Sequence, residues 1–296
     1  MPQRTMTWQM DIASDESVWN QTHDIHPILN PLDDTSVRRV LERTRLGPAP
    51  RVLDVGCGLG GWVFKILESY PEATCVGVDM VESFIERARA EAADRGVGDR
   101  TDFRTGDALK DLPDERFDLV VCAGLSEAFG GLEPMLHHLR PYLKNDGRMI
   151  IGQGLWNHEP DEECLRILDV DRDTHMPFEQ AVDMIACAGW APVYGHKSTE
   201  QEWDDFIWAC VEGLTRWALD DLRGAGEQQV PGVSTPGILL TMSSYRRAWL
   251  HGYRSALGYA TFVLRPLPPQ WIPLLFAGEL AQQTWSAQGQ ASHEDS

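Results

Sequence analysis

The 296-residue sequence lacks several features that mark common protein classes. It has no apolar run near the roughly 20 residues of a membrane-spanning helix, and its N-terminus has no hydrophobic signal core. Its six cysteines form no C-x-x-C pair, which favours reduced, buried thiols over disulfides or a zinc site. These absences predict a cytoplasmic protein without a membrane partner.

Basic residues are also scarce. The chain has 26 Lys and Arg against 45 Asp and Glu, a formal net charge of −19 and a pI near 4.8. Such a surface repels phosphate backbones, and paired arginines occur only in isolation, as at 38–39 and 246–247. The composition therefore argues against a nucleic-acid partner, and acidity that serves solubility is the simpler interpretation.

The N-terminal stretch contains two histidines, His23 and His26, spaced three residues apart. No further metal-ligand motif accompanies them, so we predict no metal site. We interpret residues 1–35 as a segment that covers the mouth of a pocket.

What the sequence does contain is a dense glycine run after a short apolar segment. Residues 51–61 read RVLDVGCGLGG, with a strand predicted over 51–55 and four glycines in the next six positions. Glycine lets the backbone turn sharply and lets a ligand approach bare main chain. The helix predicted over 60–70 would offer free N–H groups at its start. The run therefore predicts a cradle for a nucleotide or cofactor.

Apolar strands alternate with amphipathic helices along most of the chain. The predicted strands are 51–55, 74–80, 101–104, 117–124, 147–155, 191–198 and 258–265. The predicted helices are 36–45, 60–70, 82–95, 132–143, 178–188, 201–219 and 240–256. Near-continuous apolar strands separated by helices are typical of a parallel sheet covered on both faces. We predict an α/β fold with a doubly wound, mostly parallel seven-stranded sheet; residues 156–176 are acidic and receive no element.

Two long predicted helices precede the last strand. This order divides the chain into an N-terminal segment (1–35), a Rossmann-like core (36–200), a helical cap (201–257), the last core strand (258–267) and a tail (268–296). The helix over 201–219 carries two apolar strips, the second of which includes Trp208. That second strip is compatible with three roles: a wall of an acceptor pocket, ordinary core packing or a homodimer contact.

The glycine spacing alone fits two cofactors. Gly56, Gly58 and Gly61 satisfy the dinucleotide pattern G-x-G-x-x-G, and Asp79 lies near the position of a ribose-binding acid. Counted from Asp54, the run is instead D-x-G-x-G-x-G, which resembles motif I of the class I S-adenosylmethionine (SAM)-dependent methyltransferases. The segments GVDM, RTGDALKDLP, FDLVVCAG and LKNDGRMIIG extend this resemblance over about residues 36–156.

The resemblance implies which residues contact SAM. It implies that the glycine loop passes under the methionine part of SAM, that the acid ending the 74–80 strand binds both ribose hydroxyls, and that the acid after Gly106 contacts the adenine amino group. The implied SAM-binding residues are Asp54, Gly56, Cys57, Gly58, Gly60, Asp79, Met80, Gly106, Asp107, Ala108, Ala123 and Gly124. The family's L-x-P-G-G loop reads LKNDG at 143–147, away from the cofactor site.

The acceptor is less well defined. Members of the family that methylate nucleic acids or protein amides carry Asn/Asp-Pro-Pro-Tyr-like residues after the 117–124 strand, and this chain does not. We predict an enzyme that transfers a methyl group from SAM to an O, N or C atom of a small molecule, mainly through positioning. Candidate general bases are Glu127 and His158, and candidate pocket residues are Trp156, His23, His26 and Trp208. An NAD(P)-dependent oxidoreductase and a non-catalytic SAM-binding protein are the alternatives.

Overall fold

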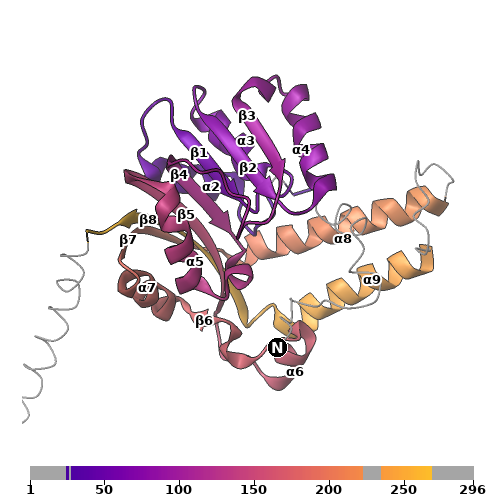
Figure 1. Ribbon diagram of the computed structural model, residues 1–296. Coiled ribbons are helices and arrows are strands. Elements are labelled where there is room, and N and C mark those ends of the chain that lie inside the picture. Colours follow the sequence, from indigo (N-terminus) through magenta and orange to yellow (C-terminus); the bar gives the residue numbers. More distant parts are fainter. Residues whose placement is uncertain (1–24, 27, 223–234, 269–296) are drawn as a thin grey trace, which may run out of the picture.

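A twisted mixed sheet runs through the computed structural model, which describes residues 25–26, 28–222 and 235–268 (Figure 1). Its strands are β1 (Arg51–Val55), β2 (Thr74–Asp79), β3 (Thr101–Thr105), β4 (Phe117–Ala123), β5 (Leu143–Trp156), β6 (Met176–Pro177), β7 (Trp190–Lys197) and β8 (Leu257–Pro266). The order is β3-β2-β1-β4-β5-β8-β7, with the two-residue β6 paired to β5. Only β8 runs antiparallel to its neighbours, β5 and β7. The predicted sheet is confirmed, and β6 adds a short eighth strand.

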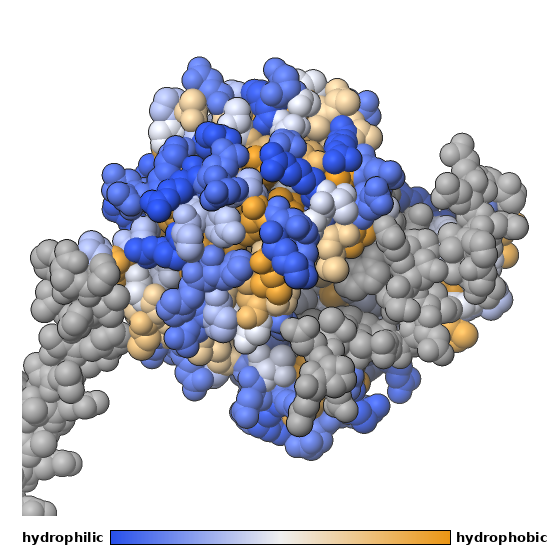
Figure 2. All heavy atoms as spheres, in the orientation of Figure 1, coloured by the Kyte–Doolittle hydropathy of each residue, from blue (hydrophilic) through white to orange (hydrophobic). Residues whose placement is uncertain are grey.

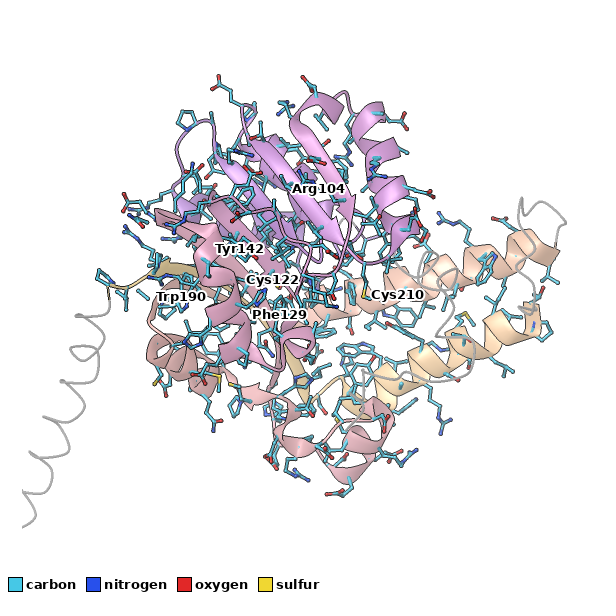
Figure 3. All side chains as sticks on the ribbon, in the orientation of Figure 1. Arg104, Cys122, Phe129, Tyr142, Trp190 and Cys210 are labelled. Atoms are coloured by element: carbon cyan, nitrogen blue, oxygen red, sulfur yellow. The ribbon has the colours of Figure 1, made fainter. Side chains whose placement is uncertain are left out.

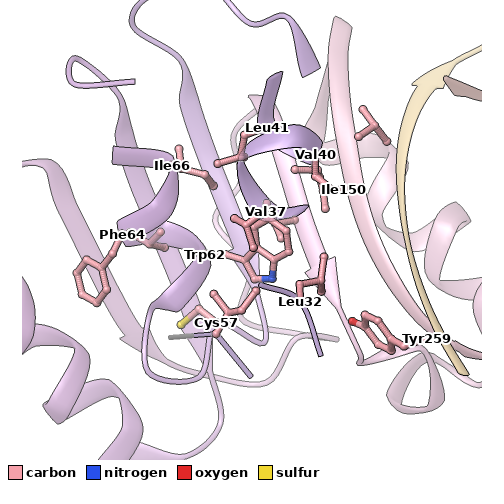
Figure 4. Packing of buried hydrophobic residues seen from close by; sticks show 14 of the residues in the cluster. Leu32, Val37, Val40, Leu41, Cys57, Trp62, Phe64, Ile66, Ile150 and Tyr259 are labelled. Carbon is pink, nitrogen blue, oxygen red and sulfur yellow. The ribbon is translucent and has the colours of Figure 1, made fainter. Parts of the chain in front are cut away.

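Helices cover both faces of the sheet, as predicted. They are α2 (Asp34–Thr44), α3 (Gly61–Ser69), α4 (Glu82–Asp94), α5 (Leu132–Leu139), α6 (Glu162–Leu168), α7 (Phe178–Cys187), α8 (Glu200–Leu222) and α9 (Thr235–Ala248). Short helical turns are η1 (Gly98–Arg100), η2 (Ser126–Phe129), η3 (Arg140–Tyr142), η4 (Arg172–Thr174) and the π-helical η5 (Trp249–Tyr253). Helices α2, α3, α4 and α8 contribute to the apolar core on one face (Figure 4), and α5 and α7 to the core on the other.

Several predicted boundaries are wrong. Helix α5 ends at Leu139 and β5 begins at Leu143, whereas the sequence predicted a helix to 143 and a strand from 147. Leu143 is buried and pairs with Phe117, but three exposed polar residues, 144–146, follow it and hide the start of the strand. The α-helix predicted over 240–256 is α9 followed by the π-helical η5, and it ends at 253.

Helix α6 lies in the acidic stretch for which the sequence predicted no element. Asp161 caps it, accepting a hydrogen bond from Cys164 N at 2.7 Å through Oδ1. Cys164 and Leu168 are buried, and the partly buried Leu165 and Ile167 also pack against the core, so apolar side chains hold this short helix in place.

Helices α8 and α9 lie side by side and project from the body of the protein (Figure 1). As predicted, they fall between β7 and the last strand. The start of α8 packs on the core, where Trp203 stacks on Trp249 with ring centroids 5.3 Å apart. That this pair caps a pocket stays a prediction.

The cysteines are unpaired, as the sequence predicted. All six are free thiols, and all except Cys187 are buried. Figure 3 shows two of them, Cys122 on β4 and Cys210 on α8, on separate elements. Hydrophilic side chains dominate the upper part of the face in Figure 2, in keeping with the net charge of −19. Over the described ranges, none of the helices has the length and apolar character needed to cross a membrane.

Glu202, in the first turn of α8, ties this helix to the core. Its carboxylate accepts hydrogen bonds from Thr199 N (2.8 Å) and Asp33 N (3.2 Å) and lies 3.1 Å from His196 Nε2. The side chain is 5% exposed. Burial by itself raises the pKa of this carboxyl, but the hydrogen bonds from His196, Thr199, Ser36 and Asp33 outweigh burial and lower the pKa to about 2.

We predict a pH-dependent cost for Glu202→Gln. Because the folded-state pKa lies below the ordinary 4.5, ionised Glu202 stabilises the fold above about pH 4.5 and loses that effect as the pH falls toward 2. The substitution should lower the free energy of unfolding by about 1–3 kcal/mol at pH 7. Urea titrations should show the difference from wild type shrinking at about pH 3. Exposed Glu212→Gln on the same helix is the control; an equal loss at both pH values would contradict the prediction.

Candidate functional site

The glycine turn joins β1 to α3 at the carboxyl edge of the sheet. Gly56, Gly58 and Gly60 have φ angles of +73°, +52° and +81°, which L side chains rarely adopt. Gly56 N donates to Val78 O at 2.8 Å, so the turn is fixed to the end of β2. Gly60 precedes the first turn of α3 and provides no side-chain cap, which leaves main-chain N–H groups of that turn for a ligand.

Asp79 ends β2 and faces this turn. Its Oδ2 accepts from Gly58 N at 2.8 Å and its Oδ1 from Val81 N at 3.0 Å. Burial raises the pKa of the carboxyl, and the hydrogen bonds from Val81 and Gly58 only partly offset that rise. Each carboxylate oxygen has two lone pairs, so Asp79 retains capacity for two hydroxyl donors. The neighbouring Met80 is 77% exposed.

Asp54 lies beneath the turn and is almost completely enclosed. It is 2% exposed, and its Oδ2 has no hydrogen-bond partner among the described residues. Burial, with a smaller contribution from the charge of Asp79, raises the pKa of Asp54 to about 8. Its carboxyl is therefore mostly neutral at pH 7. Cys57 beside it is likewise buried, which raises the pKa of its thiol.

The loop after β3 places Gly106, Asp107 and Ala108 beside the end of β2. Gly106 N donates to Asp79 O at 2.9 Å. The Asp107 carboxylate pairs with Lys110 Nζ at 2.6 Å and accepts from Leu109 N at 2.9 Å. The hydrogen bond from Lys110 lowers the pKa of Asp107. In this structure the carboxylate organises its own turn, and contact with an adenine stays a prediction.

The end of β4 is held by a residue that the sequence did not reveal. Asn30, 5% exposed, donates from Nδ2 to Ala123 O at 3.4 Å and accepts from Trp62 Nε1 at 2.9 Å. Asn30 therefore links α3 to the point where β4 passes into Gly124, a glycine with φ of +88°. No local pattern could have identified it, because Asn30 and Ala123 are 93 positions apart.

The two candidate bases follow neighbouring strands but are not joined. Glu127 lies on η2 after β4, and His158 follows β5; both side chains are exposed. The described structure contains no hydrogen bond between them. His158 lines a hollow of about 310 Å³ together with Asn157, Lys197, Glu200, Trp203, Arg254, Ser255 and Leu257. A proton-transfer role for either residue stays a prediction.

The two tryptophans predicted to line a pocket have different environments. Trp156 is 7% exposed; its Nε1 donates to Arg172 O at 2.8 Å, and its ring meets the edge of His175 at 5.0 Å. Trp208 is 44% exposed on α8. Their contact with a substrate stays a prediction.

Of the two N-terminal histidines, His23 lies outside the described residues. His26 packs edge-on against Phe206 of α8, with ring centroids 5.4 Å apart, and burial lowers its pKa. Within residues 25–26, 28–222 and 235–268, no group of three or more His, Cys, Asp or Glu side chains is arranged to hold a metal ion.

A family model described as a methyltransferase domain matches residues 46–190. Residues 46–190 form a methyltransferase domain. A SAM-dependent methyltransferase from Geobacter sulfurreducens, solved with S-adenosyl-L-homocysteine, has the same fold: the TM-score is 0.75 at 23% identity, over 85% of this chain and 98% of that one. The methyltransferase domain of residues 46–190 and the class I, Rossmann-like fold favour the SAM pattern of the glycine turn over the dinucleotide pattern.

Two relatives match part of the chain. YjhP of Escherichia coli, an uncharacterised protein, is 29% identical over 154 residues, which are 52% of this chain and 60% of YjhP. A probable chloroplastic tocopherol O-methyltransferase of Oryza sativa is 35% identical over 119 residues, 39% of this chain and 32% of that protein. The chain thus spans between about a third and three fifths of the length of these relatives.

Proposed function

We propose that this protein transfers a methyl group from SAM to a small-molecule acceptor. The observation that carries the proposal is the glycine turn of a methyltransferase domain bonded directly to the strand-end acid, Gly58 N to Asp79 Oδ2. The unpartnered Asp54 carboxyl and the bare α3 N-terminus add polar groups that a ligand at this turn would complete.

The residues of the site fit the parts of SAM. Asp79 would accept hydrogen bonds from the ribose hydroxyls, because a carboxylate is an acceptor for two donors at once. The Gly56–Gly60 main chain would lie under the methionine part, with Asp54 nearest its ammonium group. Residues 106–108 would flank the adenine, and Ala123 and Gly124 would border the methyl group.

Positioning carries most of the proposed chemistry. SAM supplies a methyl group activated by a sulfonium sulfur. The protein must hold the acceptor atom in line with the methyl carbon and exclude water, which lowers the entropic part of the barrier. Where the acceptor loses a proton, Glu127 and His158 are the side chains that could take it. The Asn30 link between Trp62 and Ala123 keeps the end of β4 in place for this alignment.

A small-molecule acceptor is supported by the name of the rice relative, a tocopherol O-methyltransferase, and by the lack of an Asn/Asp-Pro-Pro-Tyr-like sequence after β4. The free cysteines support a reducing, cytoplasmic location. A homodimer stays a prediction.

Calorimetric titration of the full chain with SAM, S-adenosylhomocysteine and NAD tests the proposal. We expect the two sulfur cofactors to bind and NAD not to bind; tight binding of NAD alone would overturn the assignment. Release of S-adenosylhomocysteine in the presence of candidate acceptors then separates an enzyme from a SAM-binding protein without activity.

SAM binding should release a proton from Asp54. With a pKa of about 8, this carboxyl is mostly protonated at pH 7, and a cationic ammonium beside it would favour the ionised form. Titrations at pH 7 in buffers of different ionisation enthalpy should show release approaching one proton for each SAM bound. Asp54→Asn should abolish the release. Equal release by wild type and Asp54→Asn would assign the proton to another group.

A further inference from the structure

Two neighbouring rings near the carboxyl end of β5 each carry a buried hydrogen-bond donor without an acceptor. Tyr259 of β8 and Trp203 of α8 are 6% and 9% exposed, and their rings meet edge to face with centroids 6.5 Å apart. Neither the Tyr259 hydroxyl nor the Trp203 indole N–H has a hydrogen-bond partner within the described part of the chain. Buried polar groups are nearly always paired, so two unpaired donors on neighbouring rings point to a ligand that completes them.

The Tyr259 hydroxyl lies at the ends of β4 and β5. A Cβ built on Gly152 would fall 1.8 Å from the hydroxyl oxygen, and one built on Gly124 would lie 3.8 Å from it and 3.4 Å from Asn30 Nδ2. Figure 4 shows Tyr259 on the same side of the sheet as Trp62 and Leu32, with its hydroxyl directed toward them. The hydroxyl therefore adjoins the place where β4 would present an acceptor to the methyl group.

Trp203 extends the same surface toward the hollow of about 310 Å³. Ser198 N donates to Tyr259 O at 2.9 Å, so the junction of β7 and α8 is fixed beside Tyr259. Among the charged residues of the hollow, Arg254 pairs with Glu200 and with Asp204 of α8, whereas Lys197 is without an ion pair in the described structure. The neutral donor Trp203 and the cation Lys197 therefore line the same hollow.

The chemistry of these groups selects one kind of partner. An indole N–H can only donate, and burial raises the pKa of the Tyr259 phenol well above its ordinary value, so the phenol remains a donor at neutral pH. Two donors require a hydrogen-bond acceptor atom. An ammonium group has no acceptor atom, so it would leave the indole N–H of Trp203 unsatisfied.

We propose that Tyr259 and Trp203 together bind a carbonyl or carboxylate oxygen of the methyl acceptor, which makes the substrate class small ketones or carboxylic acids rather than amines. This inference rests on the proposed methyl transfer, because it places the oxygen beside Gly124. Both residues are positioning residues that hold the acceptor against the end of β4.

The test uses the full chain saturated with S-adenosylhomocysteine and three probes with the same ring: phenylacetate, phenylacetone and phenethylamine. We expect the two oxygen compounds to bind more tightly than the amine. Tyr259→Phe, which keeps the ring and its packing, should weaken the binding of both oxygen compounds about three- to tenfold. In a ¹H–¹⁵N spectrum, the indole resonance that Trp203→Phe removes should move downfield when phenylacetate is added.

Tyr194→Phe, a part-buried tyrosine of β7, is the matched control and should bind the probes like wild type. Tyr259→Phe should retain wild-type affinity for S-adenosylhomocysteine, since the hydroxyl contacts the acceptor and not the donor. If wild type fails to bind S-adenosylhomocysteine, the proposed function itself is wrong. If it binds S-adenosylhomocysteine but the amine binds best, or Tyr259→Phe leaves the oxygen probes unaffected, this inference alone is overturned.

Discussion

Replacing Asp79 with alanine should weaken SAM binding by at least about tenfold. A hydrogen bond to a charged group contributes about 1.5–3 kcal/mol, and 1.4 kcal/mol corresponds to a factor of ten in affinity. Asp79 would bond two ribose hydroxyls, and its Oδ2 also accepts the Gly58 N–H of the turn. The substitution removes both the ligand contacts and the brace between β2 and the glycine turn. Calorimetric titration with SAM measures the loss.

Two controls separate the contact of Asp79 with the ligand from its hydrogen bond to Gly58 N. Asp102→Ala removes an exposed acid of the adjacent strand β3, whose carboxylate pairs with Arg104, and should leave SAM affinity unchanged. If Asp79 contacts the ribose directly, the affinity lost in Asp79→Ala should be smaller for an S-adenosylhomocysteine analogue that lacks the 2′-hydroxyl. A folded Asp79→Ala variant with wild-type affinity for SAM would refute the ribose assignment.

Gly60→Ala should lower the free energy of unfolding by about 2–5 kcal/mol. A left-handed backbone costs an L residue about 1–2 kcal/mol, and overpacking adds about 1–3 kcal/mol. Both apply here: Gly60 has φ of +81°, and an added Cβ would lie 2.8 Å from Phe103 Cζ and 3.1 Å from Phe64 Cε2. The two rings are buried, with centroids 6.0 Å apart, so neither can move away freely.

Two other glycines divide this cost into its parts. Gly96 has φ of +66° but no atom within 4 Å of an added Cβ, so Gly96→Ala should show the backbone cost alone, about 1–2 kcal/mol. Gly98 lies in the helical turn η1 with open space around it, and Gly98→Ala should leave stability nearly unchanged. Urea unfolding of the three variants gives the comparison. Equal stabilities for Gly60→Ala and Gly98→Ala would show that the turn tolerates a side chain.

The central strands were predictable because they are buried on both faces. Near-continuous apolar runs such as 117–124 are typical of strands covered on both faces. Errors occurred where burial and composition disagree. Leu143 is a buried strand residue followed by three exposed polar ones, and α6 depends on two buried side chains within an acidic stretch.

The donor side of the site was predictable for a related reason. Its acids lie at or close to the ends of strands, and a carboxyl group at a strand end is visible in a local pattern. Asn30, Trp203 and Tyr259 are not visible in this way, because only folding brings them to the site. Asn30 bonds a residue 93 positions away. Trp203 comes from helix α8 and Tyr259 from the antiparallel strand β8, next to the edge of the sheet. Tyr259 also reads as an ordinary apolar strand residue, and only its unpartnered hydroxyl distinguishes it.

The pairing of β7 with β8 separates the proposed donor site from the α8–α9 segment. Lys197 of β7 pairs with Ala260 of β8, and Ser198 N donates to Tyr259 O. The chain therefore leaves the sheet after β7 and returns to it at adjacent residue pairs of the same two strands. The segment between those pairs, which includes α8 and α9, lies outside the sheet, and its length does not set the register of the sheet. Trp203 lies on that segment, whereas Asp54, Gly58 and Asp79 lie on β1 and β2 and in the turn after β1. The length of the segment that carries Trp203 can therefore vary without a change in the strands that carry the proposed donor site.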